Sequence, residues 1–405
     1  MSLRSIHKSY KVELNPTQKQ REILNKNFGC VRFTYNWCVN KFIENKEKRI
    51  PFSKFKYIRE FVEFKRNNKE YSFLIEKDIS SVPLQQVILN FDKSVMFFFK
   101  KGYGFPQYKK KGVCKDSYRE YNFNINRTKD KKGSLRIYER RIHIPKLGWT
   151  KIKGKPEKYL PLNKTIQYIT ISKDVDRYFI SILYKDNITI VDDSVETINK
   201  NFKVIGIDLG IKNLMTICHD ESMEIVENKD FTKKYSNKLA KEQKRLSLKK
   251  KGSNNSRKQR LKVAKIHRKI RNSRNDYIHK LTNYITSKTK NSVIMMEDLR
   301  TKSMIVNGNR TLSRSLSNVS FNKIQQLMNY KSLRNGSRME LIPFNYPSTK
   351  MCCGCGNIKD MSLNDRVYEC DNVYCVYYNL LIDRDYNSSI NIRDYYFKYM
   401  SQAVA

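Results

Sequence analysis

The first apolar positions along the chain alternate with polar ones, as they do in a half-buried strand. Tyr10, Val12 and Leu14 fall on one face of an extended segment, and Asn15-Pro16 then reads as a helix cap with proline in the first turn. A second helix is predicted from about Pro83 to Phe99, after which the segment KKGYGFPQYKKKG contains glycine and proline. We therefore expect a strand that leads directly into a helix, and a later helix that ends in an aromatic and basic loop.

Between residues 117 and 190 the pattern changes to short apolar runs of strand length. TIQYITIS and RYFISILYK are two of them, and the turn from Asp174 to Arg177 separates them. We predict that residues 1–195 form one nucleic-acid-binding domain, a β-barrel or sheet with a helical insertion.

The second half of the chain alternates strands with long helical segments. KVIGIDLGIKNLMTICHD follows the polar linker DDSVETINKN and predicts two paired strands, and NSVIMMEDLR predicts another. Residues 233–284 have apolar positions three, four or seven residues apart, which predicts a helical hairpin with its turn at KKKGSNN. We expect residues 196–347 to form the first part of an α/β catalytic domain, with a mobile loop at 300–318, and residues 380–405 to complete it. The whole chain is predicted to be an α+β multidomain protein.

The charge of the chain indicates its partner. Lys and Arg number 81 against 39 Asp and Glu among 405 residues, a formal net charge of +42. Such an excess repels itself unless a polyanion neutralises it, so nucleic acid is the expected partner. An AT-rich genome explains part of the lysine count, but it does not reduce Asp and Glu. The basic outer faces of the hairpin fit a solvated surface or a nucleic-acid clamp, and the net charge favours the clamp.

No segment approaches the roughly 20 apolar residues that cross a bilayer, and the N-terminus has no apolar signal core. We expect no membrane partner and a soluble intracellular protein. In a prokaryote it would be cytoplasmic and nucleoid-associated, and in a eukaryotic or viral setting it would be in the nucleus or a viral factory.

Three carboxylates stand where chemistry is expected. Asp208 ends the apolar strand VIGID, Glu297 ends the strand VIMME, and Asp385 begins a predicted helix in IDRDYNSSINI. Phosphodiester hydrolysis needs divalent cations, and Mg²⁺ prefers carboxylate ligands. Taken singly, Asp208 could cap a turn and Glu297 could be an exposed strand end, but the three together favour a magnesium site.

Five of the nine cysteines lie between residues 352 and 375, which in a reducing compartment indicates a metal site. Cys352, Cys355, Cys370 and Cys375 are the favoured ligands, and Cys353 could replace Cys352. Four thiolates close a tetrahedral zinc site and leave no open position, so we expect a structural Zn²⁺ in a zinc ribbon at 348–379.

Aromatic and basic residues alternate in RFTYNW, FFFKKGYGFPQYKKK and SYREYNF. Aromatic rings can stack on bases while lysines contact phosphates, although Phe97 to Phe99 fit the core better than a base contact. The nucleic-acid-binding candidates are Tyr35, Trp37, Tyr103, Phe105, Lys109, Lys110, Lys111, Lys249, Lys250 and Lys251.

Several of these segments together resemble the TnpB family, the transposon-encoded RNA-guided nucleases related to type V CRISPR effectors and to Fanzor. They are GIDLGIKN, MEDLR, the STKMCCGCG and YEC knuckles, and DRDYNSSINI. YKVELNPTQKQ, GCVRFTYNW, FFFKKGYGFPQYKKK, IHIPKLGW and RLSLKKKGSNN extend the likeness over nearly the whole chain.

The resemblance implies an RNase H-like (RuvC) nuclease domain with the basic hairpin and the zinc ribbon inserted. It implies a Mg²⁺-dependent DNA endonuclease of a transposable element, with Asp208, Glu297 and Asp385 as ligands of two magnesium ions. Its partners would be a guide RNA from the transposon end and target double-stranded DNA with a short adjacent motif. The family pattern of Asp, any residue, Asn and a small residue falls on 385–388, and whether Asp383 assists Asp385 stays open. The sequence departs from the family in Ser388-Ser389 and in the wider second knuckle CDNVYC, which leaves the host and the subfamily open.

Three alternatives use these residues differently. A catalytically silent RNA-guided repressor is expected to lose one or more of the carboxylates, and all three are present. A single-strand transposase of the kind that accompanies these genes needs a paired His motif and a nucleophilic tyrosine, and the five histidines never form such a pair, whereas an accessory protein of transposition stays open. A Holliday-junction resolvase shares the acidic chemistry but does not explain the knuckles or the basic N-terminal half.

Overall fold

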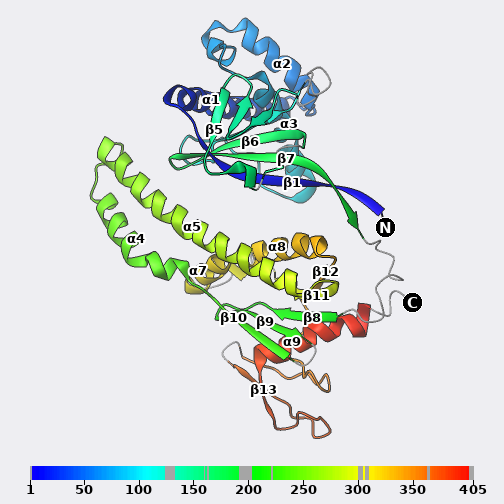
Figure 1. Ribbon diagram of the computed structural model, residues 1–405. Helices are drawn as coiled ribbons and strands as arrows, with labels where there is room; N and C mark the ends of the chain where they lie inside the picture. The colour runs from blue at the N-terminus through cyan, green and yellow to red at the C-terminus, as the bar shows by residue number, and fades with distance from the viewer. Residues whose placement is uncertain are drawn as a thin grey trace. The chain divides into compact units, whose positions relative to one another are not determined.

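The computed structural model describes residues 2–123, 133–158, 160–161, 164–190, 203–219, 222–299, 304–305, 310–362 and 365–400. The chain divides into two compact units, Leu3–Thr189 and Ile190–Ala405 with Met1–Ser2 (Figure 1). The predicted linker at 192–201 lies outside the described residues.

The N-terminal unit contains a seven-stranded sheet in the order β2-β6-β7-β1-β5-β4-β3. A closed barrel would require the two edge strands, β2 and β3, to pair with each other. The Ser134 N–H donates to the Phe123 carbonyl at 2.9 Å near these strands, but among the described residues β2 and β3 do not pair. The β-structure is therefore confirmed as a sheet, and the closed barrel is not. The strands are β1 (Ser2–Asn15), β2 (Ser117–Tyr121), β3 (Arg136–Tyr138), β4 (Arg141–Ile144), β5 (Gly148–Ile152), β6 (Ile166–Asp174) and β7 (Arg177–Ile190).

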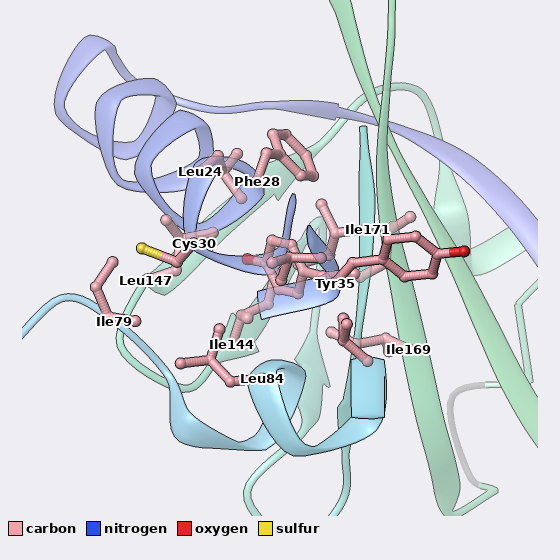
Figure 2. Packing of buried hydrophobic residues seen from close by; sticks show 14 of the residues in the cluster. Leu24, Phe28, Cys30, Tyr35, Ile79, Leu84, Ile144, Leu147, Ile169 and Ile171 are labelled. Atoms are coloured by element: carbon pink, nitrogen blue, oxygen red, sulfur yellow. The ribbon is translucent and has the colours of Figure 1, made fainter. Parts of the chain in front are cut away.

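Three helices belong to this unit: α1 (Gln18–Glu47), α2 (Lys54–Asn67) and α3 (Ser81–Lys101). The cap of α1 is Thr17, which forms a capping box with Gln20, so the helix begins two residues later than Asn15-Pro16 predicts. α3 confirms the predicted second helix, and it ends at Gly102 with φ 62°, a left-handed conformation that suits glycine. Apolar side chains of α1, α3 and the sheet form one core. Figure 2 shows Tyr35 together with other members of this core.

The C-terminal unit is built on a five-stranded sheet in the order β10-β9-β8-β11-β12. β9 pairs antiparallel with both β8 and β10, whereas β11 runs parallel to both β8 and β12. The strands are β8 (Lys203–Asp208), β9 (Asn213–His219), β10 (Ser222–Glu227), β11 (Ser292–Glu297) and β12 (Arg338–Ile342).

Helices cover both faces of this sheet (Figure 1). α5 (Asn254–Lys288), α7 (Arg310–Val319) and α8 (Phe321–Arg334) pack on one face, and α9 (Arg384–Tyr395) packs on the other. α9 approaches β8 very closely, because a Cβ on Gly206 would overlap the Ser389 carbonyl oxygen.

Two further segments complete the unit. α4 (Phe231–Ser247) and α5 form the predicted helical hairpin.

The prediction of a mobile loop at 300–318 is wrong over the last part of that segment. Residues from Arg310 form α7, where Leu316 and Val319 are buried in the core. Beyond it, β13 (Val367–Glu369) and β14 (Leu381–Asp383) pair next to the cysteines. In the described part of the chain, no helix is both long and apolar enough to cross a membrane.

Candidate active site and cysteine cluster

Three carboxylates from separate segments meet at one edge of the C-terminal sheet. Asp208 and Glu297 end β8 and β11, which run parallel with Ile207 opposite Met296. Asp385 lies in the first turn of α9, the helix that packs on β8. The two strands point the same way, so their carboxyl ends place Asp208 and Glu297 at the same edge.

The electrostatics of Asp208 reflect this convergence. Asp208 is only 7% exposed, and its burial raises the pKa of the carboxyl well above the ordinary value. The charges of Glu297 and Asp385 raise the pKa of Asp208 further, whereas a hydrogen bond from Ser388 lowers it. Burial also raises the pKa of Glu297. The site therefore concentrates negative charge that a bound cation would neutralise.

Side chains that the sequence did not single out hold these carboxylates. Ser388 Oγ donates to Asp208 Oδ1 at 3.3 Å, and Ser348 Oγ donates to Glu297 Oε1. Gln325 Nε2 donates to the Glu297 carbonyl at 2.6 Å. Sequence reasoning treated Ser388 only as a small residue, and its position one residue after Asn387 in the family pattern was the available signal.

Asp383 has a different role from Asp385. Asp383 is the N-cap of α9, where its Oδ1 accepts a hydrogen bond from the Tyr386 N–H at 3.0 Å. Asp385 instead lies 3.4 Å from the Arg384 guanidinium, and its charge acts on Asp208. The capping geometry assigns Asp383 to helix stability.

The four cysteines Cys352, Cys355, Cys370 and Cys375 form a compact group whose sulfur atoms all lie within 4.8 Å of one another. Two Sγ–Sγ distances are 3.7 Å (Cys352 to Cys375) and 3.6 Å (Cys355 to Cys370). Tetrahedral zinc with Zn–S bonds of about 2.3 Å separates its sulfurs by about 3.8 Å, whereas a disulfide holds them at about 2.05 Å. The group therefore fits a metal ion and not disulfides.

The ionisation of Cys355 suits a ligand. Burial opposes the thiolate, but hydrogen bonds from the Asn357 backbone and from neighbouring side chains lower the pKa of Cys355 to about 7. Cys353 lies outside the group, and burial raises its pKa to about 12. Cys352, and not Cys353, is thus the member of the group in this structure.

The nucleic-acid-binding candidates divide by exposure. Tyr103, Lys110, Lys111, Lys249, Lys250 and Lys251 are exposed. Tyr35 is a core residue, 9% exposed, and the Lys109 ammonium lies over its ring, 3.8 Å from the ring centre. Trp37 packs against Phe61 and Phe64, and Phe105 against Phe42, so these rings serve packing.

The expectation that Phe97 to Phe99 lie in the core is wrong for two of the three rings. Phe99 is 66% exposed and Phe97 40%, while Phe98 packs against the core. They sit in the last turns of α3, where that helix leaves the core. Phe97 contacts the exposed Tyr103, so an aromatic surface continues from α3 into the basic loop.

The hairpin carries a basic groove between its two helices. The groove measures about 340 Å³ and is lined by Tyr235, Lys238, Glu242, Lys262, Lys265, Ile266 and Lys269. Lys269 lies 5.3 Å from the centre of the Tyr235 ring. Four lysines and one ring in a groove suit a phosphate backbone.

Family models match three parts of the chain. Residues 187–307 match the OrfB_IS605 model, described as "Probable transposase", and residues 1–50 match its helix-turn-helix domain. Residues 321–392, which include the cysteine group and most of α9, match the Cas12f1-like TNB domain. In this structure the segment matched as helix-turn-helix consists mainly of strand β1 and helix α1.

Several relatives carry the name "Putative RNA-guided DNA endonuclease", and two of them align with most of this chain. One, from Streptomyces pristinaespiralis, is 29% identical over 96% of this chain and 89% of its own length. The other, InsQ of Escherichia coli (strain K12), is 29% identical over 89% of this chain and 87% of its own length. A solved Cas12f1 chain, from a complex with sgRNA and target DNA, aligns with a TM-score of 0.53 at 11% identity. That alignment covers 96% of this chain and 99% of the solved one, and indicates a shared fold.

Proposed function

Because the chain belongs to the TnpB family, we propose that it is an RNA-guided DNA endonuclease of an IS605-type transposable element. The observation that carries the proposal is the convergence of Asp208, Glu297 and Asp385 at one edge of the C-terminal sheet. The five-stranded sheet with helices on both faces fits the α/β nuclease domain that the resemblance implies and supports the same function.

The three carboxylates would hold two magnesium ions. Asp208 interacts electrostatically with both other carboxylates, so Asp208, Glu297 and Asp385 together would supply the ligands. Bound magnesium supplies positive charge that stabilises the attacking and leaving oxygens of a phosphodiester. Ser388 and Ser348 donate hydrogen bonds to Asp208 and Glu297 and would hold these two carboxylates in a fixed orientation for binding the cations.

The silent-repressor alternative is disfavoured by the burial of the acidic site. A buried cluster of carboxylates costs stability unless cations bind it, and a protein that no longer cuts has no need to keep it. Asp208 and Glu297 both keep their hydrogen-bonded supports in this chain.

For the nucleic acids, we propose that exposed lysines of the hairpin turn and its groove contact phosphates of a guide RNA and its target. Base pairing with the guide would select the target, and the N-terminal unit would read the short flanking motif. The exposed rings of Phe97, Phe99 and Tyr103 form an aromatic surface in that unit, next to the lysines of the basic loop, and would stack on bases.

The decisive experiment expresses the protein together with the DNA that flanks its gene and sequences the RNA that copurifies. We expect one reproducible transcript whose end extends into flanking sequence. The purified complex should then cut, in magnesium, a plasmid that contains a sequence complementary to that end. A library of short motifs next to this sequence in the plasmid would identify the flanking motif. Only heterogeneous cellular RNA, or no dependence of cutting on complementarity, would contradict guided cleavage.

We further propose that the cysteine group binds one structural Zn²⁺, and two adjacent cysteines provide a matched test. Cys352→Ser removes a ligand and is expected to reduce zinc from about one ion per chain to a small fraction of that. Cys353→Ser, one residue away, should keep the zinc content of the unaltered protein, because Cys353 lies outside the group. Mass spectrometry of the metal in both purified variants measures this. Equal loss in the two variants would mean that Cys353 can take the ligand position.

A further inference from the structure

The carboxamide of Asn387 holds the peptide groups on both sides of the metal ligand Cys352. Its Nδ2 donates to the Met351 carbonyl at 2.7 Å, and its Oδ1 accepts from the Cys353 N–H at 2.9 Å. Asn387 is fully buried and lies two residues after Asp385 on α9. One side chain therefore joins the first cysteine knuckle to the helix that carries a catalytic carboxylate.

A second carboxamide extends this connection toward Glu297. Asn391, one turn further along α9, donates through Nδ2 to the Met351 carbonyl at 2.6 Å and to the Ser348 carbonyl at 2.8 Å. Ser348 in turn donates its hydroxyl hydrogen bond to Glu297. Ser348 and Asn391 are both buried, so water cannot readily replace these bonds.

Each of the three carboxylates is thus tied to the knuckle by a short path. Asp385 is carried by α9 itself, Asp208 is held by Ser388 of the same helix, and Glu297 is held by Ser348. We infer that Asn387 and Asn391 are positioning residues, through which a metal at the cysteine group sets the divalent-cation affinity of the carboxylate site. This inference rests on the proposed function.

The physical reason is the small size of the ribbon. Within the described residues the knuckle has a small core of its own, consisting mainly of the cysteines and Tyr368, so its shape depends on the thiolates being held together. If the metal leaves, Met351 and Cys353 lose their fixed positions and the two carboxamides lose their partners. Ser348 then no longer fixes Glu297, and the carboxylates become a looser ligand set.

The test measures Mn²⁺ binding to the purified full-length protein by the electron paramagnetic resonance signal of free Mn²⁺. Asn387→Ala is expected to weaken Mn²⁺ binding about 10- to 100-fold, the usual effect of removing a group that orients metal ligands. Its zinc content should stay unchanged, because the cysteines are intact. Ser389→Ala is the matched control: among the described residues, this buried serine of α9 donates within its own helix, to the Tyr386 carbonyl, and the variant should bind Mn²⁺ within about twofold of the unaltered protein.

The second arm removes the metal at the cysteines. Cys352→Ser should weaken Mn²⁺ binding to a similar extent, and the double variant with Asn387→Ala should be no weaker than the more affected single variant, since both act through one connection. Circular dichroism identifies any variant that has lost its fold. If Asn387→Ala does not fold, Asn391→Ala takes its place in the test. Full Mn²⁺ affinity in zinc-free Cys352→Ser protein, or additive effects in the double variant, would overturn the inference.

Asp208→Asn separates this inference from the proposed function. It should remove the tight Mn²⁺ site altogether. If Asp208→Asn binds Mn²⁺ normally, the carboxylate site itself is wrongly assigned. If it loses binding while Asn387→Ala and Cys352→Ser do not, the site stands and only the connection to the cysteines fails.

Discussion

Asp208→Asn is expected to lower the rate of target cleavage by at least about 100- to 1000-fold, the scale for losing a group that stabilises transition-state charge directly. Asn keeps the size of the side chain and an oxygen that can accept the Ser388 hydrogen bond, but it removes the negative charge that would bind magnesium. Single-turnover cleavage by the purified complex with its copurified RNA measures the effect. Guide RNA should still copurify with the variant.

The same substitution is expected to stabilise the magnesium-free protein. The folded-state pKa of Asp208 is raised above the unfolded value, so the carboxyl contributes stability below about pH 4 that is lost as pH rises through the raised pKa. At neutral pH without magnesium the unaltered protein therefore carries the free-energy cost of burying this carboxyl, and Asn does not, because it does not titrate. Thermal unfolding in magnesium-free buffer without chelator, so that the cysteine site keeps its metal, should give a higher Tm for the variant.

Added magnesium should then raise the Tm of the unaltered protein and leave that of Asp208→Asn nearly unchanged. This pairing distinguishes a lost ligand from a damaged fold, since damage lowers both activity and Tm. A variant that still cuts in magnesium, or one that unfolds earlier than the unaltered protein, would count against the assignment.

Asp383 and Asp385 provide a control within one helix turn. Asp385→Asn should lose cleavage as Asp208→Asn does. Asp383→Asn should cut within a few-fold of the unaltered enzyme, because Asn caps a helix as well as Asp. Comparable losses in both variants would show that Asp383 acts in the site.

The three carboxylates and the four cysteines that the sequence singled out each lie together in the structure, whereas the nucleic-acid-binding candidates do not all lie at the surface, and the difference has a physical reason. Asp208 and Glu297 end apolar runs, and the cysteines recur at ligand spacings, so local pattern alone marks them. Tyr35 and Phe99 are both aromatic residues near lysines, yet one is buried and the other exposed. Which face of a helix meets the core depends on the neighbouring elements, and composition does not encode it.

The supports of the site were also beyond the sequence alone. Asn387, Asn391 and Ser348 act across contacts of 34 to 51 residues in sequence separation. The sequence favoured Cys352 but left Cys353 open as its replacement, because the two are adjacent, and the fold places Cys352 in the sulfur group. The sequence did not predict α7, because its serines and asparagine favour loops. In the fold, buried leucine and valine side chains stabilise the helix.

Gly206→Ala is the second substitution expected to have a large effect, although it changes no chemical group of the site. Its Cβ would overlap the Ser389 carbonyl oxygen and lie 2.7 Å from the Arg393 backbone nitrogen. Both obstacles are main-chain atoms of α9, which no side-chain rotation can move. β8 and α9 would therefore have to separate, at a cost of about 1–3 kcal/mol or more in the free energy of unfolding.

That separation should reduce the cleavage rate by a larger factor than the loss in the free energy of unfolding alone would cause. Gly206 lies two residues before Asp208, and α9 carries both Asp385 and the Ser388 hydroxyl that holds Asp208. A displacement of about 1 Å between reacting groups can cost about 100-fold in rate, so we expect a loss of that order in protein that is still folded at the assay temperature. Thermal unfolding and single-turnover cleavage of the same preparation measure the two effects.

Gly29→Ala is the matched control, because nothing lies within 4 Å of a Cβ at that position of α1. There the same substitution should stabilise the helix by about 1 kcal/mol and leave cleavage unchanged. If Gly206→Ala instead cleaves at the normal rate, β8 and α9 do not need their close contact during catalysis. The carboxylates of the strand and the helix would then not act together, and a catalytic site that depends on their convergence would have to be abandoned.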